Sequence, residues 1–141
     1  MPSGDNAFVP ELIVETERRT QLVDVTDQVA ELLARSEGSL ATLFVPHTTA
    51  GIVLQAAGEG ARAVATDVAG AFDRLVEEDW PWEHLHEGDR NPWSHVRAAL
   101  TASSVSIPLL DGRLALGAHQ AIFLAEFDGP RERTIVVTVV P

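Results

Sequence analysis

The chain has 141 residues, of which 45% are hydrophobic and 22% charged, which is the size and composition of one globular domain. A formal net charge of −11 argues against a protein that binds nucleic acid, because such proteins present a basic face. The absence of cysteine excludes disulfides and thiol chemistry, and no apolar run reaches the ~18 residues of a membrane span, so we expect a cytoplasmic protein without a membrane partner.

The first half of the chain is predicted to contain four strands and two helices. Residues 1–7 are small and polar, so we expect a flexible N-terminus before a single domain over residues 8–141. Thr26 is a favourable N-cap for a helix over residues 27–35, and apolar residues at helical spacing predict a longer helix over residues 61–76. Runs rich in β-branched residues predict strands over residues 8–15, 21–25, 40–45 and 51–56.

A polar segment over residues 46–49 separates two of these apolar runs. His47, Thr48 and Thr49 are costly to bury unless something pairs with them, and an imidazole binds metals or transfers protons near neutral pH. The alternative is that His47 caps a turn while the threonine hydroxyls bond the local backbone. The residues of this segment alone leave both interpretations open.

Residues 77–95 have little regular pattern, yet they contain all three tryptophans and three of the five histidines, His84, His86 and His95. Aromatic and ligand-type side chains in an irregular segment are typical of a loop at a functional site. Asn91-Pro92 predicts the start of a helix that runs to about residue 102. Capping alone would explain Asn91, and exposure to solvent would explain His86.

The C-terminal part is predicted to be almost entirely β-structure. Strands are expected over residues 104–110, 113–116, 121–127 and 133–140, with an Asp111-Gly112 turn signal between the first two. The run 121–127 is apolar on both faces, as in a central strand or a strand at a subunit interface. Strands at both ends and about three helices between them predict an α+β fold, a single compact domain with mixed or antiparallel, sandwich-like sheets.

Four side chains are candidate metal ligands or acid–base groups: His47, His84, Asp89 and His95. There is no HExxH motif and no CxxC pair, so no short motif establishes a metal site. Histidines this far apart in sequence converge only if the fold brings them together.

Several motifs resemble the YjbQ family, whose members are described as secondary thiamine-phosphate synthases. The motifs occur in the family's order and spacing over roughly residues 40–133. They are PHTTA at 46–50, WEH at 82–84, EGD at 87–89 with Asn91, SHVRAAL at 94–100, DGRL at 111–114, QAIFL at 120–124 and EFDGPR at 126–131.

The resemblance implies a compact α+β domain that assembles as a homotrimer, with a histidine cluster near a subunit interface. Carried over by position, His47, His84 and His95 would bind a divalent metal, and His47, His95 and Asp89 would be the catalytic residues. Histidine ligands beside a carboxylate suit Zn best, while Fe, Mn and Ni stay open.

The family's activity joins a pyrimidine pyrophosphate to a thiazole phosphate and displaces pyrophosphate. Such a reaction needs cations at the leaving group and a site closed to water. The resemblance assigns the binding of the small phosphorylated substrate to Thr48, Thr49, Asn91, Gln120 and Arg131. For Arg131 the structural alternative is an ion pair with Glu126 or Asp128.

The chain departs from the family pattern in two segments, residues 55–60 and 117–120. Ala56 stands where the family usually has Glu, and His119 stands where it has a large aromatic residue. His119 is either an added ligand or, as we favour, a packed strand histidine. If the missing carboxylate serves the chemistry, activity is weakened or altered.

Three functions therefore compete. The first, which we favour, is a thiamine-phosphate synthase-like transferase or a diverged enzyme acting on related phosphorylated small molecules. The second is a metal-dependent hydrolase that uses a histidine-bound metal to activate water. The third is a non-catalytic trimer that binds a metal or a small ligand.

Overall fold

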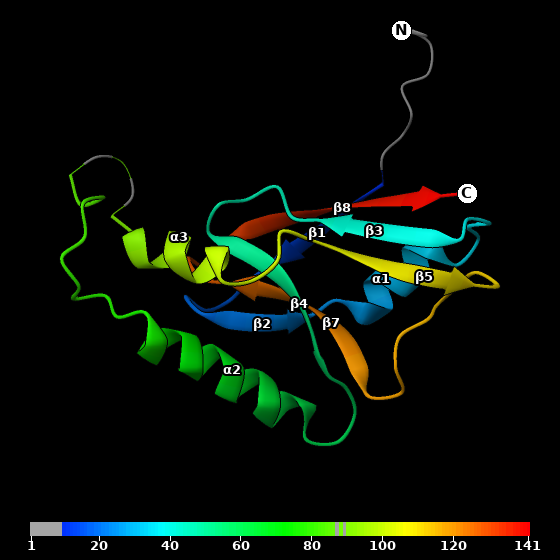
Figure 1. Cartoon of the computed structure of the whole chain (residues 1–141), viewed down its shortest axis with the longest axis horizontal. Helices are drawn as coiled ribbons and strands as arrows, with labels where there is room; N and C mark the ends of the chain where they lie inside the picture. The colour runs from blue at the N-terminus through cyan, green and yellow to red at the C-terminus, as the bar shows by residue number, and fades with distance from the viewer. Residues whose placement is uncertain (1–9, 87, 89) are drawn as a thin grey trace, which may run out of the picture.

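The structure, a computed structural model, describes residues 10–86, 88 and 90–141. Within these residues the fold is α+β, with two antiparallel sheets and three helices, as predicted (Figure 1). No described helix combines the length and the apolar character needed to cross a bilayer. The predicted flexible N-terminus, residues 1–7, lies outside the described residues.

The larger sheet has five antiparallel strands. Their order is β1 (Glu11–Glu15), β8 (Glu132–Val140), β3 (Leu40–Phe44), β5 (Ser104–Leu110) and β6 (Arg113–Leu114). Asp111 and Gly112 join β5 to β6 with positive φ angles of 52° and 76°, which confirms the predicted hairpin turn. On β8, Ile135 and Val137 face the interior, and the same two-residue period turns Arg133 inward.

The smaller sheet has the order β2 (Gln21–Asp24), β7 (Gln120–Glu126) and β4 (Ala50–Ala56). Every residue from Ala121 to Phe127 is buried, which confirms the central position predicted from a run that is apolar on both faces. Because β3 and β4 belong to different sheets, the polar segment 46–49 is the place where the chain crosses from one sheet to the other.

The main core lies between the two sheets. It combines Leu43 and Val137 of the larger sheet with Ile52 and Leu124 of the smaller one, and α1 (Thr26–Leu33) adds to it. The opposite face of the smaller sheet is covered by α2 (Ala61–Leu75) (Figure 1). No described element covers the outer face of the larger sheet, which exposes Ile13, Phe44, Leu110 and Val140.

The starts of two helices differ from expectation in their capping. α1 begins at Thr26 itself, so the prediction that Thr26 is the N-cap is wrong by one residue. The Thr26 hydroxyl donates to Asp24 at 2.6 Å and accepts from the backbone N–H of Ile122 at 2.8 Å, so it fastens the helix to β7. α3 (Pro92–Ala99) follows Asn91 as predicted, but the Asn91 side chain makes no capping bond.

The end of α3 also differs from expectation. The predicted helix runs to residue 102, whereas α3 ends at Ala99. Ala102 instead pairs with Ile52 of β4 in an isolated antiparallel bridge. The chain leaves the helix early because its backbone groups are taken up by this pairing.

Candidate functional site

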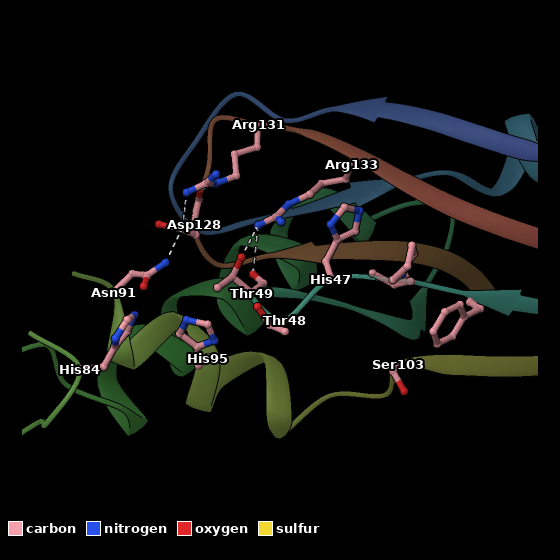
Figure 2. A pocket seen from close by; sticks show the side chains of 13 residues that line it. His47, Thr48, Thr49, His84, Asn91, His95, Ser103, Asp128, Arg131 and Arg133 are labelled. Carbon is pink, nitrogen blue, oxygen red and sulfur yellow. Dashed lines mark hydrogen bonds and ion pairs between the residues drawn. The ribbon is translucent and has the colours of Figure 1, made fainter. Parts of the chain in front are cut away.

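A hollow of about 730 Å³ lies where the chain crosses from β3 to β4 (Figure 2). We call it the His47 pocket. The turn after β7, the start of β8 and the start of α3 border it. The polar residues that line it are His47, Thr48, Thr49, His84, Asn91, His95, Ser103, Asp128, Arg131 and Arg133. The structure therefore brings together most of the site residues that the sequence predicts.

A buried ion pair borders the pocket. Glu126 is 0% exposed and Arg133 4%. Arg133 Nε donates to the two carboxylate oxygens of Glu126 at 2.9 and 3.0 Å, and Nη2 donates to Thr49 Oγ1 at 2.8 Å. Arg133 Nη1 makes no hydrogen bond to the residues that the structure describes. The pair joins the two sheets and leaves one guanidinium nitrogen for a ligand.

His47 is held in one orientation by the backbone. Its Nε2 accepts a hydrogen bond from the N–H of Thr134 at 2.9 Å. Burial, and then the neighbouring Arg133 guanidinium, lower the pKa of His47 below its ordinary value of 6.5. His47 is therefore neutral at pH 7, and because Nε2 is an acceptor, the ring proton sits on Nδ1. The His47 side chain therefore does not cap a local turn, which was the alternative that the sequence left open.

Thr49 and Thr48 have different environments. Thr49 is 6% exposed and its hydroxyl accepts from Arg133, so it is neither free for a ligand nor bonded only to the local backbone. Thr48 is exposed, and its side chain makes no hydrogen bond among the described residues. Thr48 is thus the threonine of this segment whose hydroxyl is available to a ligand.

Asn91, Asp128 and Arg131 form a linked group at the pocket edge (Figure 2). Asn91 Nδ2 and Arg131 Nη2 each donate to Asp128 Oδ2 at 2.7 Å. The ion pair predicted as the structural alternative for Arg131 is thus present, while Arg131 also lines the pocket. Asn91 is 6% exposed, and its Oδ1 has no hydrogen-bond partner among the described residues. Rotating the amide would set Oδ1 against a carboxylate, so Oδ1 stays a buried acceptor without a partner among the described residues.

The predicted metal ligands are only partly assembled. His84 and His95 lie edge to face with 5.3 Å between ring centroids. Within the described part of the chain, no group of three His, Asp or Glu is arranged to hold a metal ion. His47 has no unprotonated nitrogen left for a metal in this tautomer, because Nε2 accepts from Thr134 and Nδ1 carries the ring proton. The histidines therefore fit a metal in part, with the pair His84–His95 supplying two nitrogens.

Some predicted residues lie elsewhere. Asp89 falls outside the described residues, so its role stays a prediction. Gln120 pairs with Ala56 at the far end of the smaller sheet, six residues or about 20 Å along β7 from Glu126. His119 is exposed in the turn before β7, so the expectation that it is packed is wrong. Both departures from the family pattern thus lie at the end of the sheet away from the His47 pocket.

Sequence reasoning missed Arg133 and Glu126 as site residues. A signal was present in the sequence. Arg133 alternates with Ile135 and Val137 and so faces the same side of its strand, and Glu126 ends an otherwise apolar run. A charge at a buried position of a strand demands a partner. Neither pattern identifies the oppositely charged residue with which Arg133 or Glu126 pairs.

Comparison with known proteins gives a consistent result. The sequence model of the family described as "UPF0047 protein YjbQ-like" matches residues 10–141. A UPF0047 protein of Archaeoglobus fulgidus is 37% identical over 127 residues, which is 90% of this chain and 97% of that protein. The UPF0047 protein YugU of Bacillus subtilis is 33% identical over 132 residues, covering 89% of this chain and 94% of YugU.

Solved structures resemble the fold over nearly its whole length. The hypothetical protein APE1520 from Aeropyrum pernix superposes with a TM-score of 0.85 at 35% identity, covering 94% of this chain and 97% of that one. A protein of unknown function from Sulfolobus solfataricus, described as YbjQ-like, gives a TM-score of 0.83 at 33% identity, covering 92% and 94%.

Proposed function

Because the chain belongs to the YjbQ-like UPF0047 family, we propose that the His47 pocket binds a phosphorylated small molecule and that the protein is a thiamine-phosphate synthase-like transferase. In that reaction a carbon–nitrogen bond forms between the thiazole and the pyrimidine methylene group. The carbon–oxygen bond to pyrophosphate breaks, and its electron pair leaves with the pyrophosphate.

The observation that carries this proposal is the guanidinium of Arg133. Its Nε and Nη2 are held by Glu126 and Thr49, so the group is fixed before any ligand arrives. Nη1, which has no partner among the described residues, is then a preorganised donor for a phosphate oxygen. Arg131 and the hydroxyl of Thr48 line the same pocket and add further donors.

His47 suits a role as a neutral hydrogen-bond donor. Its depressed pKa keeps the ring uncharged at pH 7, and the Nδ1–H bonds a phosphate oxygen without adding a full charge to bury. This set of donors fits the oxygens of a phosphorylated molecule.

A divalent metal is part of the proposal. His84 and His95 would hold it, with the carboxylate of Asp89 as a further ligand, and Zn is the metal that this set favours. When bound, the metal would neutralise charge on the departing pyrophosphate. The arginines and Thr48 would orient the remaining phosphate oxygens.

We also propose that the protein is a cytoplasmic homotrimer. The outer face of the larger sheet is uncovered, and large apolar side chains on it are exposed, among them Phe44 (44%) and Leu110 (66%). Exposed apolar surface of this kind marks an interaction site. Phe44 also lines the His47 pocket, so a neighbouring subunit on this sheet would help to close the site to water.

The test is pyrophosphate release from a pyrimidine pyrophosphate and a thiazole phosphate. A transferase releases pyrophosphate only when both are present. Arg131→Met should lower the rate about a hundredfold, because it removes a cation from the transition state. The matched control is Arg113→Met, on exposed β6 away from the pocket, which should leave the rate unchanged.

Other outcomes reassign the function. Phosphate released from one substrate alone would identify a hydrolase. Binding of both substrates without turnover would identify a non-catalytic ligand-binding protein. Binding of neither would overturn the phosphate site itself.

A further inference from the structure

A second hollow, of about 500 Å³, adjoins the His47 pocket and differs from it in chemistry. We call it the Trp82 slot. Its apolar lining comes from Pro81, Trp82, Pro92 and Val96. His84 and His95 line both hollows, so the two adjoin at this histidine pair.

The wall of the slot is built in advance of any ligand. Trp82 stacks on Trp80 with 5.4 Å between ring centroids and 25° between ring planes. Its Nε1 donates to the backbone carbonyl of Glu77 at 3.2 Å. The indole is therefore held in position from one side and along one edge. The rings of Pro81 and Pro92 are rigid as well, so the slot loses little side-chain entropy when it is filled.

We propose that the Trp82 slot binds a flat aromatic or heteroaromatic ring of the substrate whose phosphate occupies the His47 pocket. This inference rests on the proposed phosphate site. Aromatic rings stack favourably on a fixed indole face, and proline and valine give the remaining apolar contact. The histidine pair shared by the two hollows would lie beside the atoms that link ring to phosphate.

The position of the slot next to the polar pocket is what selects this occupant. A purely apolar ligand would gain nothing from Arg131 and Arg133 across the histidine pair, and an inorganic anion would gain nothing from Trp82. A phosphate monoester with a ring a few bonds away engages both hollows at once. The substrate class is therefore a phosphorylated compound with a planar ring.

The first experiment measures binding to the full chain by isothermal titration, with benzyl phosphate, methyl phosphate and inorganic phosphate as probes. We expect benzyl phosphate to bind about tenfold more tightly than methyl phosphate, since ring stacking and burial together reach that factor. Tryptophan fluorescence should change with benzyl phosphate and not with the other two, because Trp82 lines the slot.

Three variants separate the slot from the phosphate site. Val96→Phe, on α3, fills the slot without removing a polar group and should reduce the benzyl preference to about onefold while methyl phosphate binds as before. Leu100→Phe, one helical turn further along and 60% exposed, adds similar bulk outside the slot and should keep the preference. Trp82→Leu keeps an apolar wall but removes the flat face, and should lower the preference as well.

The outcomes are distinguishable. Equal affinity for benzyl and methyl phosphate in the unmodified chain would overturn the ring site and leave the phosphate site standing. Failure of all three phosphates to bind, with benzyl alcohol as a fourth probe still bound, would overturn the phosphate site and keep the slot. A benzyl preference that Val96→Phe does not change, in a variant with unaltered melting temperature, would place the ring elsewhere. If a neighbouring subunit's side chain fills the slot, the preference will be absent and the inference is wrong.

Discussion

Replacing Glu126 with Gln tests whether the buried ion pair holds the pocket together. Every group that approaches the carboxylate donates to it, including Thr16 Oγ1 at 2.8 Å, the N–H of Phe127 at 3.1 Å and Nε of Arg133. The amide nitrogen of Gln must therefore face donors, and Arg133 becomes a buried cation without its counter-ion. Removing one partner of such a pair costs about 3–5 kcal/mol of unfolding free energy.

The assay is chemical and thermal unfolding at fixed protein concentration. At roughly 4 °C per kcal/mol for a chain of this size, the melting temperature of Glu126→Gln should fall by about 12–20 °C. Phosphate should restore part of the loss by binding Arg133, whereas chloride at the same ionic strength should not. The control is Glu31→Gln, exposed on α1, which should change stability by less than about 0.5 kcal/mol.

A double-mutant cycle tests the structural role of the ion pair. Arg133→Met should cost less in the Glu126→Gln background than in the unmodified chain, because the unpaired cation is then removed. If the two losses simply add, or if Glu126→Gln is as stable as the control, the ion pair does not have the structural role inferred for it.

Three further predictions concern the same region. Burial lowers the pKa of His47, so below pH 6.5, the ordinary pKa of histidine, the unfolded chain binds a proton that the folded chain does not. The free energy of unfolding is therefore at its full value above that pH and falls below it. In chelator-treated protein, His47→Gln should therefore flatten the loss of unfolding free energy between about pH 7.5 and about pH 5.5, and the exposed His86→Gln should not. Elemental analysis should find a divalent metal that is lost in the His84→Ala, His95→Ala double variant and kept in His86→Ala; equal content in both would exclude the pair as ligands. Gly129→Ala should lower the melting temperature and weaken phosphate binding, because a Cβ there would lie 2.1 Å from a backbone carbonyl oxygen; an unchanged melting temperature would contradict that packing.

Much of the fold follows from local pattern. The apolar run 121–127 predicts a central strand, and β7 is the centre of the smaller sheet. The Asp111-Gly112 pair predicts a hairpin, and both residues adopt the positive φ that the turn requires. These features are readable because neighbours in sequence determine the periodicity of a strand and the conformation of a turn.

The site depended on contacts between segments far apart. Asn91 stands at the N-cap position that the sequence predicts, yet its side chain donates to Asp128, 37 residues away. Gln120 belongs to one of the family motifs, as the site residues do, but the direction of the strand places it at the end of β7 far from the pocket. Local pattern describes the position of each residue on its own element and says nothing about its partner.

The α+β class, the family and a set of polar residues that are costly to bury alone all follow from the sequence. The pairing of Arg133 with Glu126 and Thr49, and the position of His84 and His95 between a polar pocket and an apolar slot, follow from the three-dimensional structure. The physical reason is the distance along the chain over which each interaction acts. Hydrophobic periodicity acts over a few residues, whereas the pairing of buried charges depends on how two sheets and their crossing loop are set against each other.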